Sequence, residues 1–170
     1  MDSNKKERVF SMLRSINRPG MDTVIERLES YGYFDAKCYG HHRYRGGVVD
    51  HSLEVYDYMM EHAGGHLPQE SIVIAALFHD LGKAVRRGQR YGNTDHAGRS
   101  LAVLDECGLV LTEDERKAIG MHHQWKSLEA VACLMTCPLR ALLSKGDCDS
   151  TGRWKAAHPD MRRHHHTAAR

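Results

Sequence analysis

The chain has 170 residues, enough for one domain with a single hydrophobic core. Its 24 Lys and Arg against 22 Asp and Glu leave a formal net charge of +2, which excludes the strongly basic surface of a dedicated duplex-binding protein. Five cysteines, no signal-like apolar start and no run of roughly 18 apolar residues predict a cytoplasmic protein with no membrane partner.

Two short helices are predicted at the start of the chain. Apolar residues recur at helical spacing over residues 9–16, and Pro19-Gly20 ends that segment. A second helix follows at once, with Asp22 or Thr23 as its N-cap. Gly32 then stands where this helix can end, because a glycine that takes the left-handed backbone conformation often follows the last turn of a helix.

The middle of the chain predicts a loop and two helices. Residues 39–49 contain two adjacent glycines and no sustained period, which indicates a structured loop. A helix then runs from His51 to the next pair of glycines. Residues 72–84, IVIAALFHDLGKA, are apolar almost all round and predict a buried central helix with His79 and Asp80 near its end.

Three further helices are predicted in the second half. A loop over residues 86–95 precedes a helix that begins near His96 and ends at Gly108. Thr112 and Glu115 have the spacing of a capping box, so another helix runs from there to about residue 122.

The last core helix is predicted over residues 138–147, with Pro138 in its first turn. Residues 153–170 are polar and basic and predict a loose tail after a single domain over residues 1–152. Because no segment alternates with period two, the predicted fold class is all-α, a helical bundle.

The chain holds 13 histidines, and metal binding is the obvious reason for so many. Neighbouring side chains on a helix point about 100° apart, so His79 and Asp80 can lean toward one ion beside the helix. Further ligands must come from other helices, and His51 and Asp147 are available, with Asp149 as the competitor of Asp147. Imidazole and carboxylate donors suit zinc, iron, manganese, cobalt or nickel, and geometry decides among them.

These residues resemble the HD-domain metal-dependent phosphohydrolase superfamily, whose pattern is His, then His-Asp, then a distant Asp. The flanking segments HHRYRGGVVDHSLEV and ALFHDLGK agree, and the similarity covers about residues 8–150. Small phage and bacterial HD proteins and the HD module of certain 3′-to-5′ exoribonucleases are most similar in pattern. In those proteins a Pro-Leu pair opens the last ligand helix, which favours Asp147, although Lys-Gly precedes it here in place of an apolar residue and alanine.

The resemblance also implies a second ion. His96 and His122 stand where the two-metal branch of the superfamily carries ligands, and Asp80 would bridge the two ions. Such a pair, with Fe, Mn, Zn, Ni, Co or Mg not distinguishable, would activate water for attack on phosphorus. Near the site, Lys83 is the best candidate for a catalytic phosphate contact; weaker substrate-binding candidates are Arg45, His42, Lys126 and His123.

The expected substrate is a small phosphorylated molecule, such as a nucleotide, a cyclic nucleotide or a short single-stranded nucleic-acid end. One alternative is a di-iron oxygenase of the same superfamily acting on a phosphonate or polyol, but that branch carries a glutamate where this chain has Arg45-Gly46-Gly47. Another is a catalytically silent nucleotide-binding module, against which the intact ligand set argues. The sequence does not predict the oligomeric state.

Overall fold

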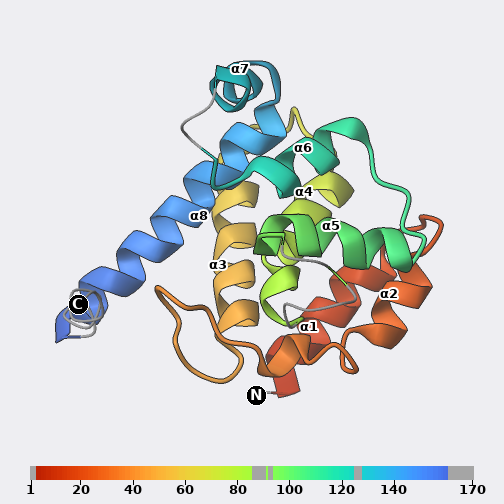
Figure 1. Ribbon diagram of the computed structural model, residues 1–170, viewed down its shortest axis with the longest axis horizontal. Helices are drawn as coiled ribbons and strands as arrows, with labels where there is room; N and C mark the ends of the chain where they lie inside the picture. Colours follow the sequence, from red (N-terminus) through yellow and green to blue (C-terminus); the bar gives the residue numbers. More distant parts are fainter. Residues whose placement is uncertain (1–2, 86–90, 92–93, 125–127, 161–170) are drawn as a thin grey trace.

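The computed structural model describes residues 3–85, 91, 94–124 and 128–160, and within these ranges the protein forms eight α-helices, two 3₁₀ helices and no strand (Figure 1). The predicted all-α fold is therefore confirmed. The elements are α1 (Ser3–Arg14), α2 (Met21–Arg27), η1 (Tyr33–Asp35), α3 (Gly47–His62), α4 (Gln69–Phe78), η2 (Leu81–Lys83), α5 (His96–Glu106), α6 (Glu113–Met121), α7 (Leu128–Thr136) and α8 (Pro138–Ala157).

The centre of the bundle is α4, in which every residue from Ser71 to Phe78 is buried. Helices α3, α6 and α8 pack around it, and α3 also packs along α8 (Figure 1). A helix that is apolar on all sides is stable only where other helices cover it, so the hydrophobic run in the sequence explains this central position. None of the described helices combines the length and the apolar character that a bilayer span requires.

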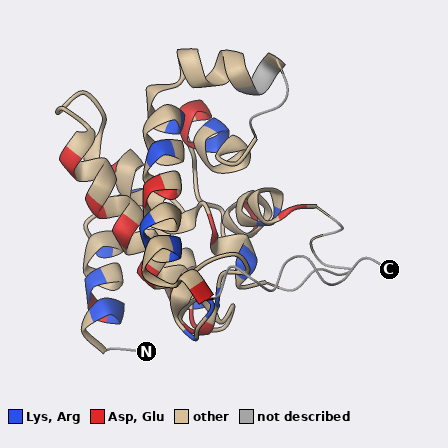
Figure 2. Cartoon of the chain, turned by 90° about the vertical axis from the view of Figure 1, so that its left-hand side faces the viewer, with Lys and Arg blue, Asp and Glu red and all other residues tan. Residues whose placement is uncertain are grey.

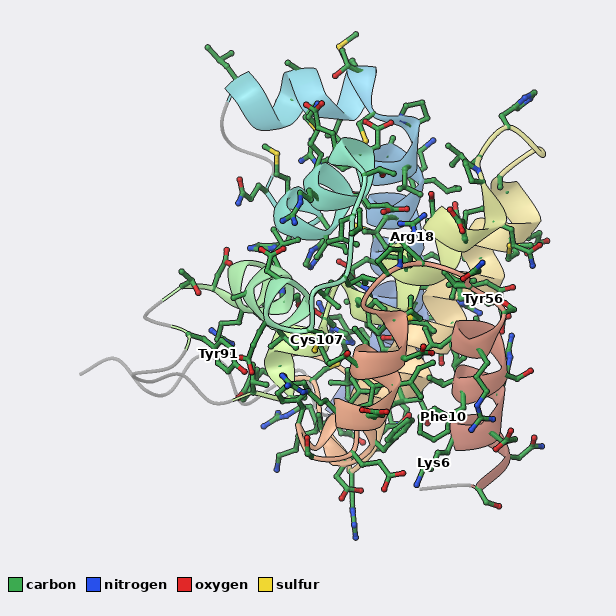
Figure 3. The ribbon with its side chains drawn as sticks, turned by 90° about the vertical axis from the view of Figure 1, so that its right-hand side faces the viewer. Lys6, Phe10, Arg18, Tyr56, Tyr91 and Cys107 are labelled. Atoms are coloured by element: carbon green, nitrogen blue, oxygen red, sulfur yellow. The ribbon has the colours of Figure 1, made fainter. Side chains whose placement is uncertain are left out.

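Helices α1 and α2 cover one side of this centre and are tied to it by mixed interactions. Phe10 packs against Phe34 with ring centroids 5.2 Å apart, and the Lys6 ammonium lies 5.9 Å from the Phe10 ring (Figure 3). Arg18, in the loop after α1, forms ion pairs with Glu70 on α4 and Glu115 on α6. Basic and acidic residues occur along the same helices in Figure 2, and their numbers are nearly equal.

Several predicted helix ends are confirmed. Gly108 has positive φ and follows the C-cap of α5, as predicted; Gly32 also has positive φ, and the Tyr33 N–H bonds back to the Leu28 carbonyl, but α2 itself ends earlier, at Arg27. The capping box at Thr112 and Glu115 is present with both of its hydrogen bonds. Helix α5 begins at His96, after an Asp95 side chain that accepts the Gly98 N–H.

Three predicted boundaries near the chain start and the centre were wrong. The N-cap of α2 is Gly20, not Asp22 or Thr23, because Gly20 takes a φ of +86° against the backbone of Gly108. Helix α3 begins at Gly47 rather than His51, so the predicted loop ends earlier than residue 49. Helix α4 ends at Phe78 with His79 as its C-cap, which places Asp80 outside the helix.

Two differences concern the C-terminal part. Helix α7, which packs against α8, was not predicted, and its apolar residues Leu128 and Met135 are exposed. Helix α8 continues to Ala157, so the loose tail predicted from residue 153 is helical at its start. Trp154 is buried there, with its ring 5.7 Å from that of His42. This contact explains why α8 extends beyond its predicted end at residue 147.

Candidate metal centre

Five helices and one 3₁₀ turn bring the six predicted ligands to one place in the bundle. His51 lies in the first half of α3, Asp147 in the middle of α8, and His96 is the first residue of α5. His79 and His122 are the C-caps of α4 and α6, and Asp80 follows His79 directly. The ligand that the sequence placed at a helix end, Asp147, is instead held within a long helix.

One set of donors surrounds the Oδ2 atom of Asp80. His51 Nε2 lies 3.7 Å and His79 Nε2 3.6 Å from this oxygen, and the two Nε2 atoms are 3.2 Å apart. Asp147 Oδ1 lies 3.1 Å from His51 Nε2. Ligand atoms about 2.0–2.2 Å from one ion are separated by about 3.0–3.5 Å. The 3.1 and 3.2 Å separations lie in this range and the 3.6 and 3.7 Å separations slightly above it, so these donors are close enough to share an ion.

A second set of donors surrounds the other oxygen of Asp80. His96 Nε2 lies 3.3 Å and His122 Nε2 3.8 Å from Oδ1, and these nitrogens are 3.2 Å apart. Oδ1 is buried and has no hydrogen-bond partner among the described residues. Since leaving a buried carboxylate oxygen unsatisfied is costly, this orphaned atom fits the bridging position between two cations.

The histidine rings are fixed so that their Nε2 lone pairs face the centre. His79 Nδ1 donates to the Ala76 carbonyl at 2.9 Å, and His122 Nδ1 donates to the Ile119 carbonyl at 2.8 Å. A neutral imidazole that donates from Nδ1 carries its lone pair on Nε2, which is the form that binds a metal ion.

Burial and charge favour the protonation states that metal binding needs. Burial lowers the pKa of His96 and of His122 to about 4, so both rings are neutral near pH 7. Burial alone would raise the pKa of Asp80, but the Lys83 ammonium and the neighbouring histidines outweigh it and hold that pKa well below its ordinary value. His96 and His122 are therefore neutral beside an ionised Asp80 carboxylate, as metal binding requires.

Gly82 allows α5 to approach the turn that carries Asp80. An added Cβ at Gly82 would lie 1.9 Å from the His96 carbonyl oxygen, so only glycine fits there. The Gly82 N–H donates to Ser100 Oγ at 2.8 Å, and Arg99 Nε donates to the Gly82 carbonyl at 3.0 Å. This close contact places His96 beside Asp80.

The structure distinguishes Asp147 from Asp149 as the last candidate ligand, and Lys83 from Arg45 as the candidate phosphate-binding cation. Asp147 is turned toward His51, whereas Asp149 pairs with Arg153 at 2.8 Å. Lys83 forms an ion pair with Asp80 Oδ2, and its side chain is 11% exposed. Arg45 is not brought to this cluster: its guanidinium is exposed and pairs with Asp35.

The other substrate-binding predictions have mixed outcomes. His42 is 1% exposed and bonds to Glu54, so it lies inside the protein rather than on an open surface. His123 stacks on His96 with ring centroids 4.6 Å apart and contacts Asp95, beside the second donor set. Lys126 lies outside the described residues.

Sequence reasoning missed two residues behind the ligands. Ser150 Oγ lies 2.9 Å from His51 Nδ1, and Glu54 Oε2 accepts a hydrogen bond from Ser150 Oγ at 2.6 Å. A helical spacing signal was present, since Glu54 follows His51 by three residues and Ser150 follows Asp147 by three.

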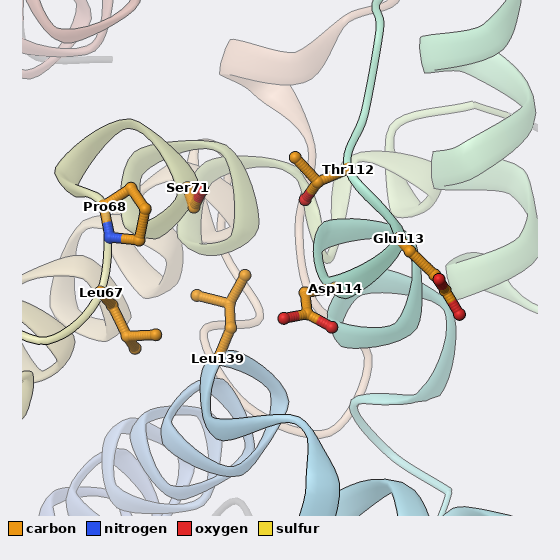
Figure 4. Close-up of a pocket in the computed structure, with 7 residues that line it drawn as sticks. All are labelled: Leu67, Pro68, Ser71, Thr112, Glu113, Asp114 and Leu139. Atoms are coloured by element: carbon orange, nitrogen blue, oxygen red, sulfur yellow. The ribbon is translucent and has the colours of Figure 1, made fainter.

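A pocket of about 400 Å³ lies elsewhere in the bundle, between the N-terminal ends of α4, α6 and α8 (Figure 4). Ser71, Thr112, Asp114 and Leu139 are among the residues that line it. It shares no residue with either donor set, so the candidate centre and this pocket are separate features.

These His and Asp side chains could hold metal, because His51 and His79 face one carboxylate oxygen of Asp80, and His96 and His122 face the other, which has no hydrogen-bond partner among the described residues. A family model described as the HD domain matches residues 48–159, about two thirds of the chain. The match spans all six predicted ligands. No curated protein and no solved structure matches the chain.

Proposed function

Because the chain belongs to the HD-domain family, we propose that it is a phosphohydrolase that cleaves a phosphate ester of a nucleotide, a cyclic nucleotide or a short nucleic-acid end. HD domains are typically metal-dependent hydrolases, and the His/Asp groups of this chain could hold metal. The observation that carries the proposal is the position of Asp80, with one carboxylate oxygen facing each donor set.

Two divalent ions per chain, of Fe, Mn, Zn, Ni, Co or Mg, are part of this proposal. When bound, such a pair supplies Lewis acidity toward phosphate oxygens and lowers the pKa of water. The chain's own residues hold the Nε2 lone pairs of His79 and His122 in place and keep Asp80 ionised.

Lys83 is the proposed phosphate contact. Burial disfavours its charged form, but the Asp80 carboxylate outweighs burial and raises its pKa, so the side chain is an ammonium near pH 7. Its position beside Asp80 brings positive charge to the edge of the centre, where a phosphate oxygen needs it. Lys83→Met should therefore lower kcat/KM while leaving the metal content unchanged.

The test starts with the metals in purified protein, counted per chain. Turnover of a generic phosphodiester and a phosphomonoester is then measured with each candidate ion. Two ions with hydrolysis that is lost in Asp80→Asn, but kept in the surface variant Asp149→Asn, would support the proposal.

Other outcomes would replace the proposal. Two irons, no hydrolysis and an oxygen-sensitive spectrum would favour the di-iron oxygenase. Bound nucleotide without any turnover would favour a silent nucleotide-binding module, and full activity of a metal-stripped Asp80→Ala variant would refute metal-dependent chemistry.

A further inference from the structure

The carboxylate of Glu54 joins two chains of hydrogen bonds that lead toward the candidate metal centre. Its Oε2 accepts from Ser150 Oγ at 2.6 Å, and its Oε1 lies 3.2 Å from His42 Nε2. Both hydrogen bonds outweigh the effect of burial and lower the pKa of Glu54 to about 2, so it is ionised near pH 7. An ionised carboxylate accepts hydrogen bonds and donates none, so it sets the direction of both chains.

The first chain determines the tautomer of His51. Because the Ser150 hydroxyl proton is used toward Glu54, Ser150 Oγ can only accept from the ring nitrogen 2.9 Å away, His51 Nδ1. His51 therefore carries its proton on Nδ1 and its lone pair on Nε2. That lone pair faces His79, Asp80 and Asp147.

The second chain reaches a histidine outside the six predicted ligands. His42 donates from Nε2 to Glu54, so the Nδ1 of a neutral His42 must accept. The atom facing it at 3.0 Å is His41 Nδ1, which is then the donor. His41 is left with its lone pair on Nε2, by the same logic that applies to His51.

His41 lies at the first donor set. Its ring centroid is 4.4 Å from that of His51, and one of its nitrogens lies within 4.8 Å of both an Asp80 carboxylate oxygen and Cys38 Sγ. Its side chain is buried, so its nitrogens face other parts of the protein.

The backbone around His41 is built to hold this arrangement. His42 has a positive φ of +42°, which is rare for a residue other than glycine and is maintained only where the surroundings impose it. The His42 carbonyl lies so close to Gly47 that an added Cβ there would be 1.9 Å from the oxygen. Glycine at position 47 thus lets the two-histidine segment pack against the start of α3.

We propose that His41 is a further ligand of the metal centre, and that Glu54 is the positioning residue that directs the lone pairs of both His41 and His51 toward it. The inference rests on the metal centre of the proposed function. It adds a seventh ligand and explains why a carboxylate is placed behind the histidines.

The test is an NMR measurement on the full chain with ¹⁵N-labelled histidine, before and after Zn²⁺ is added to chelator-treated protein. Long-range ¹H–¹⁵N correlations report which ring nitrogen carries the proton. We expect His41 and His51 to be protonated on Nδ1 without metal, and the Nε2 signals of both to shift when Zn²⁺ binds.

Glu54→Gln tests the positioning role. The amide offers one acceptor and one donor in place of two acceptors, so it can no longer accept from both Ser150 and His42. Either His41 or His51 should then carry its proton on Nε2, and Zn²⁺ affinity should fall about 10- to 100-fold, the usual effect of losing a group that orients a metal ligand. Glu61→Gln, the same change at an exposed position of α3, is the matched control and should alter neither.

The outcomes are distinguishable. A His41 signal that does not move with Zn²⁺, while those of His51, His79, His96 and His122 do, would overturn the ligand role of His41 and leave the proposed function standing. Protons on both nitrogens of His42, or unchanged tautomers in Glu54→Gln, would overturn the positioning role. If no histidine signal responds to Zn²⁺, Mn²⁺ or Fe²⁺, the metal centre itself fails, and the inference fails with it.

Discussion

Replacement of Gly82 by alanine should damage the second donor set more than any other part of the molecule. The new Cβ would lie 1.9 Å from the His96 carbonyl oxygen, 2.8 Å from the Ser100 nitrogen and 2.9 Å from the Arg99 Cβ. Two of these three contacts are with the backbone of α5, which cannot rotate out of the way. Helix α5 must therefore move away from the turn that carries Asp80.

The size of the effect follows from these contacts. Ordinary contact between such atoms is about 3.5 Å, so the first turn of α5 must shift by more than about 1 Å. Overpacking of this kind costs about 1–3 kcal/mol, and the two hydrogen bonds that Gly82 makes contribute about 0.5–1.5 kcal/mol each. We expect a loss of about 3 kcal/mol in the free energy of unfolding.

The same shift lengthens the 3.3 Å separation between His96 Nε2 and Asp80 Oδ1. Binding of the second ion should weaken at least about 10-fold, while the donors around Asp80 Oδ2 keep the first ion. Urea denaturation measures the stability, and titration with Mn²⁺ measures the two affinities.

Gly152→Ala is the matched control. Gly152 lies within α8 and an added Cβ would meet nothing within 4 Å, so alanine should stabilise the helix by about 0.5–1 kcal/mol and leave both affinities unchanged. If Gly82→Ala has wild-type stability and binds two ions normally, the close approach of α5 does not position His96 and the reasoning is wrong.

Other expected results follow from the same structure. The buried Arg140 donates to two backbone carbonyls at the end of α6, so Arg140→Met should lower the unfolding free energy by about 3 kcal/mol in urea denaturation, whereas a loss below about 1 kcal/mol would contradict this role. Thr112→Ala removes the cap of α6 and should cost about 1 kcal/mol in the same assay; no change would mean that the capping box is not needed. In the metal-free protein, burial lowers the pKa of His41 to about 3 and those of His96 and His122 to about 4, against an ordinary 6.5. The unfolded chain therefore binds more protons below pH 6.5, and the unfolding free energy should fall as the pH drops from 6.5 to about 4, by up to about 1.4 kcal/mol per unit for each histidine. A flat pH profile in this range would contradict the neutral state of these histidines.

Much of the helical framework can be read from local sequence because its signals are local. The capping box at Thr112 and the glycine at position 108 act within a few residues, so both predict helix ends that the structure contains. The pattern His51, His79-Asp80 and Asp147 can likewise be found in the sequence without knowing how the helices pack, because it resembles the pattern of a known family. The match of the HD-domain model confirms that family.

The arrangement within the centre is different, because it depends on where side chains point after the helices have packed. Asp80 lies outside α4 rather than on it, and this position lets its two oxygens face different donor sets. The partnership of Glu54 with Ser150 and His42 joins three segments far apart in the chain. The three-residue spacing puts Glu54 on the helix face of His51 and Ser150 on that of Asp147, but it does not show that the Glu54 and Ser150 side chains meet.

The sequence by itself therefore determined the fold class and several helix ends, since these follow from short-range propensity, and it named six candidate ligands through its resemblance to a known family. The tertiary structure decided the extent of α8, where Trp154 is buried near His42, and it placed His41 beside Asp80. It alone decided these features because burial and the direction of a hydrogen bond are properties of packed neighbours, and those neighbours come from segments that are distant in sequence.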